Sequence, residues 1–165
     1  MIRGFNKISF AQFSKDIVND KTMYSEYELP TRATNGSAGY DFKAIDKIII
    51  KPGEVLMIPT GIKAYMLDDE AMYIIIRSSI GYKHNIVLAN QTGVIDSDYF
   101  NNLKNEGHIF MPLRNLGNSD FILEKGQPYA QGIFTKYLKI DNEQDIITKR
   151  NGGFGSTSRK DDQNE

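Results

Sequence analysis

The chain contains no cysteine and only two histidines, and these absences limit the chemistry available to it. Without cysteine there can be neither disulfides nor thiolate metal sites, and His84 and His108 are too few ligands for a zinc centre built from His and Cys. Any bound metal is therefore expected to be a hard cation held by oxygen ligands, such as Mg²⁺.

Long apolar runs and an excess of one charge are also missing. Lys and Arg number 20 against 21 Asp and Glu, so the formal net charge is −1 at pH 7. This balance argues against a basic nucleic-acid-binding face, and no run approaches the roughly 18 apolar residues of a membrane span. The first residues, MIRGFNKISF, lack the continuous apolar stretch of a secretory signal peptide. We expect no nucleic-acid or membrane partner and a cytoplasmic location.

The composition and residue pattern of the sequence predict one β-rich domain. A chain of 165 residues, 40% of them hydrophobic, can bury a substantial core. One short helix is expected over residues 10–17, where apolar residues recur at helical spacing, and at most one or two short helices are expected in the chain as a whole. From residue 45 onward, short runs rich in Ile, Val, Phe and Tyr alternate with turn residues, and no helix separates successive strands. These runs are IDKIII, EVLMI, IKAYM, MYIIIR, NIVLA, GVI, HIFMPLRN, DFILE and YAQGIFTKYLKI. The pattern favours an all-β sandwich or barrel over a parallel α/β fold.

The pattern breaks near the end of the chain. After Ile147 the sequence reads TKRNGGFGSTSRKDDQNE, which offers almost nothing to bury. We therefore predict a β domain over residues 1–147 and a flexible tail over residues 148–165. A frayed terminus is the simplest interpretation of that tail. Phe154 argues against it, because a lone aromatic among three glycines needs something to cover its ring.

Two aspartates and a tyrosine follow an apolar run in GVIDSDYF. A carboxylate at a strand end can orient a water as a general base, and it can equally cap a hairpin as an Asx turn. Strand alternation would point Asp96 and Asp98 to the same side. Tyr99, directly after them, is either a platform for a sugar or base or an ordinary half-buried strand residue.

Two further groups of residues suit a phosphate ligand. Asp41 follows small residues, including Gly39, that allow the backbone to approach a ligand or another strand closely, and one carboxylate can hold Mg²⁺ when phosphates supply other ligands. Arg77, Ser78 and Ser79 offer a guanidinium fork and two hydroxyls, although a polar strand exit would look the same. The glycine-rich GGFGST resembles a phosphate loop in texture but lacks the lysine and spacing of a Walker A loop.

Five segments in order resemble the motifs of the trimeric dUTPase family, the dUTP diphosphatases. They are SAGYDFKA, RSS, NQTGVIDSDYF, GQPYAQ and RNGGFGST, and they extend over about three quarters of the chain. The segments GVIDSDY and GGFGST are the most specific of the five. MIRGF and NEGHIF are most similar to members from Gram-positive bacteria and their phages.

The resemblance implies a jelly-roll-like β subunit that assembles as a homotrimer and hydrolyses dUTP to dUMP and pyrophosphate with Mg²⁺. It implies that each active site combines residues of three chains. Asp96 would activate the attacking water, Tyr99 would pack under the deoxyribose, and Asn90 would contact the uracil edge. Asp41 would hold the Mg²⁺ through water.

The resemblance assigns the remaining positions to substrate binding. Gly93 and Ile95 belong to the third motif. The phosphate chain would be lined by Arg77, Ser78, Ser79 and Gln131, and the tail would close over the nucleotide with Arg150, Phe154, Gly155, Ser156 and Thr157. An ungapped comparison would put Lys149 in place of Arg150, but a planar guanidinium suits phosphate better than a point charge.

Two other functions stay open on the sequence. A dCTP deaminase of the same superfamily would share the β core but is not expected to carry the GGFGST tail. A nucleotide-binding regulatory relative without catalysis is disfavoured by the intact Asp96 and the complete tail. A purely structural jelly roll would leave five polar motifs unexplained.

Overall fold

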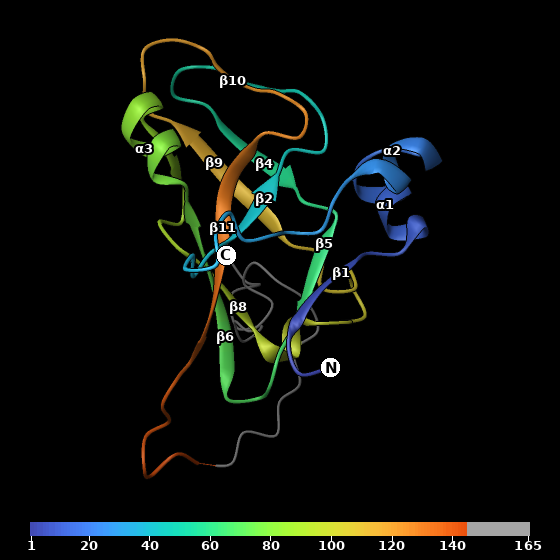
Figure 1. Ribbon diagram of the computed structural model, residues 1–165, viewed down its shortest axis with the longest axis vertical. Coiled ribbons are helices and arrows are strands. Elements are labelled where there is room, and N and C mark those ends of the chain that lie inside the picture. Colours follow the sequence, from blue (N-terminus) through green and yellow to red (C-terminus); the bar gives the residue numbers. More distant parts are fainter. Residues whose placement is uncertain (145–165) are drawn as a thin grey trace, which may run out of the picture.

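The β-forming runs pair into four antiparallel sheets in the computed structural model, which describes residues 1–144 (Figure 1). The strands are β1 (Gly4–Lys7), β2 (Tyr40–Lys43), β3 (Ile48–Ile50), β4 (Val55–Pro59), β5 (Ile62–Tyr65), β6 (Glu70–Ile76), β7 (Ile86–Leu88), β8 (Gly93–Asp96), β9 (Phe110–Asn115), β10 (Phe121–Leu123) and β11 (Pro128–Lys136). The helices are α1 (Phe10–Asp16), α2 (Lys21–Glu26) and α3 (Ser78–His84), with a 3₁₀ turn η1 (Ser97–Tyr99).

The largest sheet has four strands in the order β2-β11-β6-β8. A three-stranded sheet, β4-β9-β7, and two strand pairs, β1-β5 and β10-β3, complete the architecture. Every pairing between these strands is antiparallel. The expected all-β class is therefore confirmed, and each of the nine runs predicted from residue 45 onward contains a strand.

The sheets enclose one hydrophobic core because apolar side chains alternate along the strands. In β5, Ile62 and Ala64 are buried while the two residues between and after them are partly exposed. In β10, Phe121 and Leu123 point inward and Ile122 outward. Alternation of this kind directs one face of each strand to the core, as a sandwich or barrel requires.

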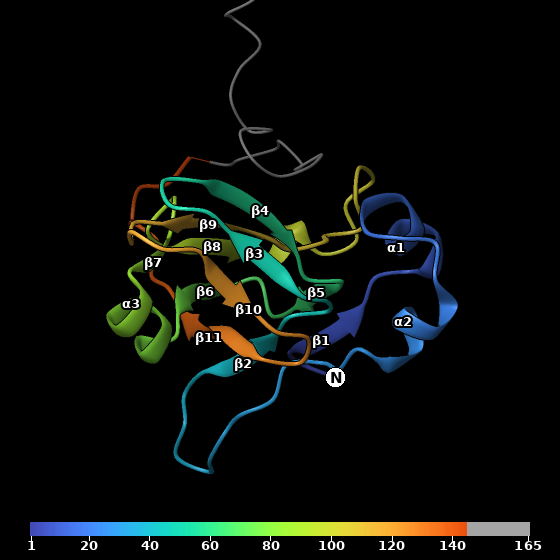
Figure 2. The same cartoon turned by 90° about the horizontal axis from the view of Figure 1, so that it is seen from above.

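The helices are short and lie at the two ends of the molecule, with α1 and α2 at one end and α3 at the other (Figure 2). The first matches the helix expected over residues 10–17, and Ser9 caps it by accepting a hydrogen bond from the Gln12 N–H. The sequence predicted at most two helices, whereas residues 1–144 form three. The polar segment after β6 is a helix, α3, that buries Ile80 and ends at Asn85 in the left-handed conformation (φ 53°).

The remaining expectations about chain organisation concern its end. The predicted boundary between domain and tail, at residue 147, lies outside the described residues.

None of the helices within residues 1–144 is long and apolar enough to cross a membrane.

Candidate active site

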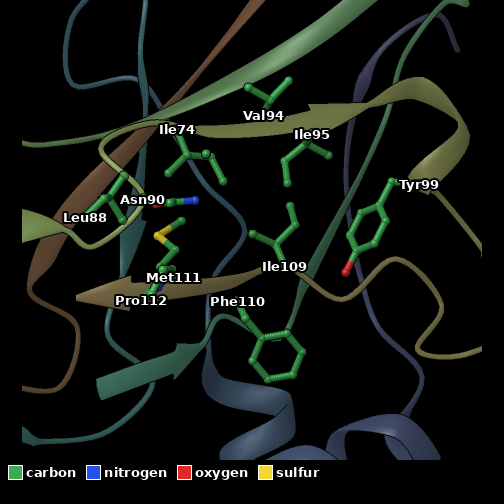
Figure 3. A pocket seen from close by; sticks show the side chains of 11 residues that line it. Ile74, Leu88, Asn90, Val94, Ile95, Tyr99, Ile109, Phe110, Met111 and Pro112 are labelled. Atoms are coloured by element: carbon green, nitrogen blue, oxygen red, sulfur yellow. The ribbon is translucent and has the colours of Figure 1, made fainter. Parts of the chain in front are cut away.

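A cavity of about 150 Å³ lies between strand β8 and strand β9 (Figure 3). Four residues predicted from the sequence line it: Asn90, Gly93, Ile95 and Tyr99. Its other walls are apolar or backbone and come from Ile74, Leu88, Val94, Ile109, Phe110, Met111 and Pro112. A small cavity with apolar walls and polar groups at defined points suits a flat ring such as a nucleobase.

The turn between β7 and β8 carries Asn90 to one end of this cavity, and Tyr99 lies at the other end (Figure 3). The turn is tight, because the Thr92 N–H donates to the Asn90 carbonyl at 2.7 Å and Gln91 adopts a positive φ of 64°. The Asn90 amide therefore projects from a backbone that hydrogen bonds hold in place.

Strand β8 leaves little room for a side chain at Gly93, where it passes the cavity. Gly93 lies opposite Ile74 of β6, and a Cβ atom at Gly93 would lie 3.2 Å from the Ile74 Cβ. That separation is shorter than an ordinary van der Waals contact between carbon atoms. A larger residue here would displace Ile74 or occupy the cavity.

The two aspartates do not share a strand face, which corrects the expectation from alternation. Strand β8 ends at Asp96, and residues Ser97–Tyr99 form the 3₁₀ turn η1, so the period of two stops before Asp98. Asp96 is half-buried and Asp98 is exposed. Asp96 itself is not among the residues that line the cavity, but in the sequence it lies between two that do, Ile95 and Tyr99.

The ring of Tyr99 is fixed at its hydroxyl end. The side chain is only 5% exposed, its hydroxyl donates to the His108 carbonyl at 2.8 Å, and Asn105 Nδ2 donates to the hydroxyl at 2.9 Å. Asn102 Nδ2 donates to the Tyr99 carbonyl at 2.8 Å. The ring is therefore held as a rigid wall of the cavity rather than as a mobile surface group.

A second cluster of predicted residues forms on neighbouring strands of the largest sheet. Asp41 of β2 lies directly opposite Gln131 of β11, and the Arg77 Nε lies 3.3 Å from the Asp41 Oδ1. Gly39 approaches β11 so closely that an added Cβ would meet the Gln131 side chain, which confirms the expected close approach to another strand. Ser78 and Ser79 begin α3, directly after Arg77. This cluster combines a guanidinium, an amide, hydroxyls and one carboxylate.

The cavity and the cluster lie well apart within one chain. Asp41 pairs with Gln131 of β11, which in turn pairs with Ile75 of β6. Asp96 of β8 pairs with Ala71, which lies four residues before Ile75 on the same strand β6. Three strand spacings of about 4.8 Å and four residues of about 3.3 Å place Asp41 and Asp96 on the order of 20 Å apart. A single chain therefore does not bring the two predicted carboxylates to one reacting centre.

Asp41 can serve as only one of several ligands of a Mg²⁺ ion. Within residues 1–144, no three His, Cys, Asp or Glu side chains are grouped so as to hold a metal. Asp41 is a single carboxylate whose charge is shared with Arg77. Such a site suits an ion that takes most of its ligands from water and from phosphate oxygens.

Comparison with known proteins decides the family. The dUTPase family model matches residues 25–158, which is most of the chain. This chain belongs to the dUTPase family. It is 47% identical over 130 residues to the deoxyuridine 5'-triphosphate nucleotidohydrolase of Lactococcus lactis, covering 78% of this chain and 87% of that protein.

Solved structures of dUTPases have the same fold. The crystal structure of dUTPase from Streptococcus mutans is 40% identical and superposes with a TM-score of 0.69, covering 84% of this chain and 99% of that one. A mutant dUTPase from phage phi11 of S. aureus has a TM-score of 0.65 at 15% identity, covers 87% of this chain and 96% of that one, and coordinates a structural Mg(II) ion. The relatives from Lactococcus lactis and Streptococcus mutans agree with the resemblance to members from Gram-positive bacteria.

Sequence reasoning missed two groups of residues in this dUTPase-family chain. The apolar walls, such as Leu88 and Met111, look like any other core positions, so no sequence signal distinguishes them. Asn105 and His108 contact Tyr99, whereas the sequence of their segment, NEGHIF, indicates only a similarity to one branch of the family. Five predicted tail positions lie outside the described residues: Arg150, Phe154, Gly155, Ser156 and Thr157.

Proposed function

We propose that the chain hydrolyses dUTP to dUMP and pyrophosphate, with Asp96 as the group that orients and deprotonates the attacking water. Membership of the dUTPase family supports this reaction. The observation that carries the assignment of residues is the cavity, because four positions of one predicted motif line it and Asp96 lies between two of them in the sequence. Water attack on the α-phosphorus would break its bond to the bridging oxygen, and pyrophosphate would leave.

Uracil would enter the cavity with its polar edge toward Asn90. A side-chain amide both donates and accepts, so it can pair with the N3–H and O4 pattern of uracil. Cytosine presents a donor where uracil presents an acceptor, which would leave a buried polar group unpaired. Sites built on such hydrogen bonds can discriminate by about 10⁴ or more.

The deoxyribose would pack against the Tyr99 ring. Because the hydroxyl of Tyr99 is tied to the His108 carbonyl and to Asn105, the ring cannot yield easily to a larger sugar. A 2′-hydroxyl would collide with it, so UTP would be a poor substrate. Gly93 and Ile95 would contact the nucleoside from β8.

The triphosphate would lie along the cluster of Arg77, Ser78, Ser79 and Gln131. Asp41 would hold Mg²⁺ through water, which leaves the phosphate oxygens to bind the ion directly. The bound ion would neutralise charge on the phosphates as the leaving group forms. Arg77, already beside Asp41 at 3.3 Å, would add a fixed positive charge next to the phosphate chain.

A homotrimer with shared sites would bring the two halves together. The distance on the order of 20 Å between Asp41 and Asp96 within one chain supports a site completed by a neighbouring copy. The tail would close the site, with Phe154 stacked over uracil and Arg150, Gly155, Ser156 and Thr157 near the phosphates. The homotrimer, the closing tail, a role in keeping uracil out of DNA and in supplying dUMP, and a cytoplasmic location stay predictions.

A nucleotide panel tests the reaction. The protein is incubated with Mg²⁺ and dUTP, dCTP, dTTP or UTP, and pyrophosphate, monophosphate and ammonia are quantified. Pyrophosphate from dUTP alone is expected. Ammonia from dCTP would favour the deaminase instead, and no product from any nucleotide would favour a binding role.

Asp96→Asn tests the assignment of the base. Removing the proton acceptor while keeping the shape should lower turnover by roughly 10² to 10⁴, the usual contribution of general-base catalysis. Affinity for a non-hydrolysable dUTP analogue should stay nearly unchanged. Equal losses of turnover and affinity would contradict the role of Asp96 in activating water. Asp98→Asn, at the exposed aspartate two residues away, is the matched control and should leave both unchanged.

A further inference from the structure

The N-terminal segment lies largely outside the part of the chain that matches the dUTPase family. The family match begins at residue 25, whereas α1 and most of α2 precede it. The helix α1 packs beside the loop that follows η1, at the end of the molecule opposite α3 (Figure 2). Its contacts with that loop reach the residue that holds Tyr99.

His108 is the centre of these contacts. Its ring is fully buried, and the Gly61 backbone N–H donates to Nε2 at 2.9 Å. Because Nε2 must accept that bond, the neutral ring carries its proton on Nδ1, which donates to Asp16 Oδ2 at 2.6 Å. Burial lowers the pKa of His108, which favours the same neutral form. Asp16 is the last residue of α1, and Gln12 Nε2 also donates to its Oδ2 at 2.7 Å.

His108 also contacts two residues that form walls of the cavity. The His108 carbonyl accepts the hydroxyl hydrogen bond of Tyr99 at 2.8 Å. The His108 ring packs against the ring of Phe110, with centroids 4.1 Å apart. Both Tyr99 and Phe110 line the cavity. A shift of the His108 ring would therefore be transmitted to the side of the cavity where the sugar is expected.

A second contact fastens the loop to the start of α1. The carboxylate of Glu106 accepts from the backbone N–H and the hydroxyl of Ser9 and from Lys63 Nζ. Burial raises the pKa of Glu106, but these donors more than offset it, and the pKa lies below its ordinary value. The adjoining Gly107 has a φ of 83°, and a Cβ there would lie 2.6 Å from the Tyr99 carbonyl oxygen. The loop is thus folded tightly against Tyr99 and is held from the N-terminal side.

We propose that α1 positions the Tyr99 ring through Asp16 and His108, so that these two are positioning residues for recognition of the deoxyribose. The inference rests on the proposed function, in which Tyr99 excludes a 2′-hydroxyl. Loss of the Asp16 carboxylate leaves the His108 Nδ1–H without its acceptor and loosens the loop. The site then accepts the larger sugar more readily.

The test compares kcat/KM for dUTP with kcat/KM for UTP. Asp16→Ala is expected to lower the ratio by roughly tenfold, since small displacements of a positioning group cost rate steeply. Asp16→Asn keeps an oxygen acceptor for the His108 Nδ1–H and should recover most of the ratio. Asp20→Ala is the matched control, because Asp20 caps α2 through the Thr22 and Met23 N–H groups and should leave the ratio unchanged.

The outcomes separate this inference from the proposed function. Suppose that the wild type hydrolyses dUTP and that Asp16→Ala and Asp20→Ala each lower kcat/KM for dUTP and for UTP by the same factor. This result would overturn the inference and leave the proposed function standing. A wild type inactive on dUTP would contradict the function and, with it, this inference. If Asp16→Ala does not fold, Gln12→Ala removes one hydrogen bond to Asp16 and should lower the ratio by roughly twofold to fivefold, the equivalent of one weak hydrogen bond. An unchanged ratio in a folded Gln12→Ala protein would then overturn the inference.

Discussion

Tyr99→Phe removes one oxygen from the candidate site and separates the structural role of this residue from its role in binding. The hydroxyl donates to the His108 carbonyl at 2.8 Å and accepts from Asn105 Nδ2 at 2.9 Å. Both partners are neutral, so each bond contributes about 1 kcal/mol to the free energy of unfolding. The His108 carbonyl keeps a longer bond from Asn105 Nδ2 at 3.3 Å, which avoids a fully unpaired acceptor.

The expected loss is therefore about 2 kcal/mol, or roughly 4–8 °C in melting temperature for a chain of this size. Thermal unfolding of variant and wild type at one protein concentration measures it. Turnover of dUTP should fall by less than roughly tenfold, because the ring that packs against the sugar is retained. Tyr82→Phe is the control, since Tyr82 is 89% exposed and its loss of a hydroxyl should change neither quantity.

Two results would refute this reasoning. An unchanged melting temperature would mean that the two hydrogen bonds do not stabilise the folded protein. A fall in turnover as large as that of Asp96→Asn would mean that the hydroxyl takes part in the reaction itself.

Two further predictions concern the cavity and the buried histidine. Gly93→Val places side-chain atoms in the cavity, with the Cβ 3.2 Å from Ile74, so KM for dUTP should rise by roughly tenfold or more in steady-state kinetics. Gly36→Val is the control, because a Cβ at Gly36 meets nothing within 4 Å. A wild-type KM in both variants would contradict this prediction. Burial lowers the pKa of His108 in the folded protein, so the unfolded chain binds the proton more tightly. Stability is then complete above the ordinary histidine pKa of about 6.5 and falls below it by up to about 1.4 kcal/mol per pH unit. The free energy of unfolding, measured with urea across this pH range, should depend less steeply on pH in His108→Asn than in the wild type. Equal slopes in the two proteins would contradict the lowered pKa of His108.

Most of the β architecture could be predicted because its signal is local. Runs such as DFILE and EVLMI contain β-branched and apolar residues bounded by turns, and each contains a strand of the structure, β10 and β4. The strands β1 and β2 were not predicted. Each is four residues long and depends on distant partners, such as the pairing of Asp41 with Gln131.

The helix α3 shows why local patterns failed elsewhere. Its sequence, SSIGYKH, includes serines and a glycine that disfavour helix. The helix forms because Ile80 is buried in the core and Asn85 ends it in the left-handed conformation. Both reasons belong to the tertiary structure, which the sequence pattern alone does not describe.

The candidate site divides in the same way. Asn90, Gly93, Ile95 and Tyr99 lie within the short segment 90–99, so a sequence motif captures them together. The control of Tyr99 by Asp16 could not be predicted, because 92 residues separate Asp16 from His108 and only the packing of α1 joins them.

The claim that Asp96 and the phosphate cluster of one active site come from two different copies of the chain can be tested by mixing inactive variants. Asp96→Asn lacks the base but keeps the phosphate cluster, and Arg77→Ala keeps the base but lacks the guanidinium. Co-expressed in equal amounts, they should assemble at random, and about a quarter of the shared sites would combine an intact Asp96 with an intact Arg77. The account predicts turnover near that fraction of wild type. Turnover no higher than the sum of the two variants measured alone would contradict it.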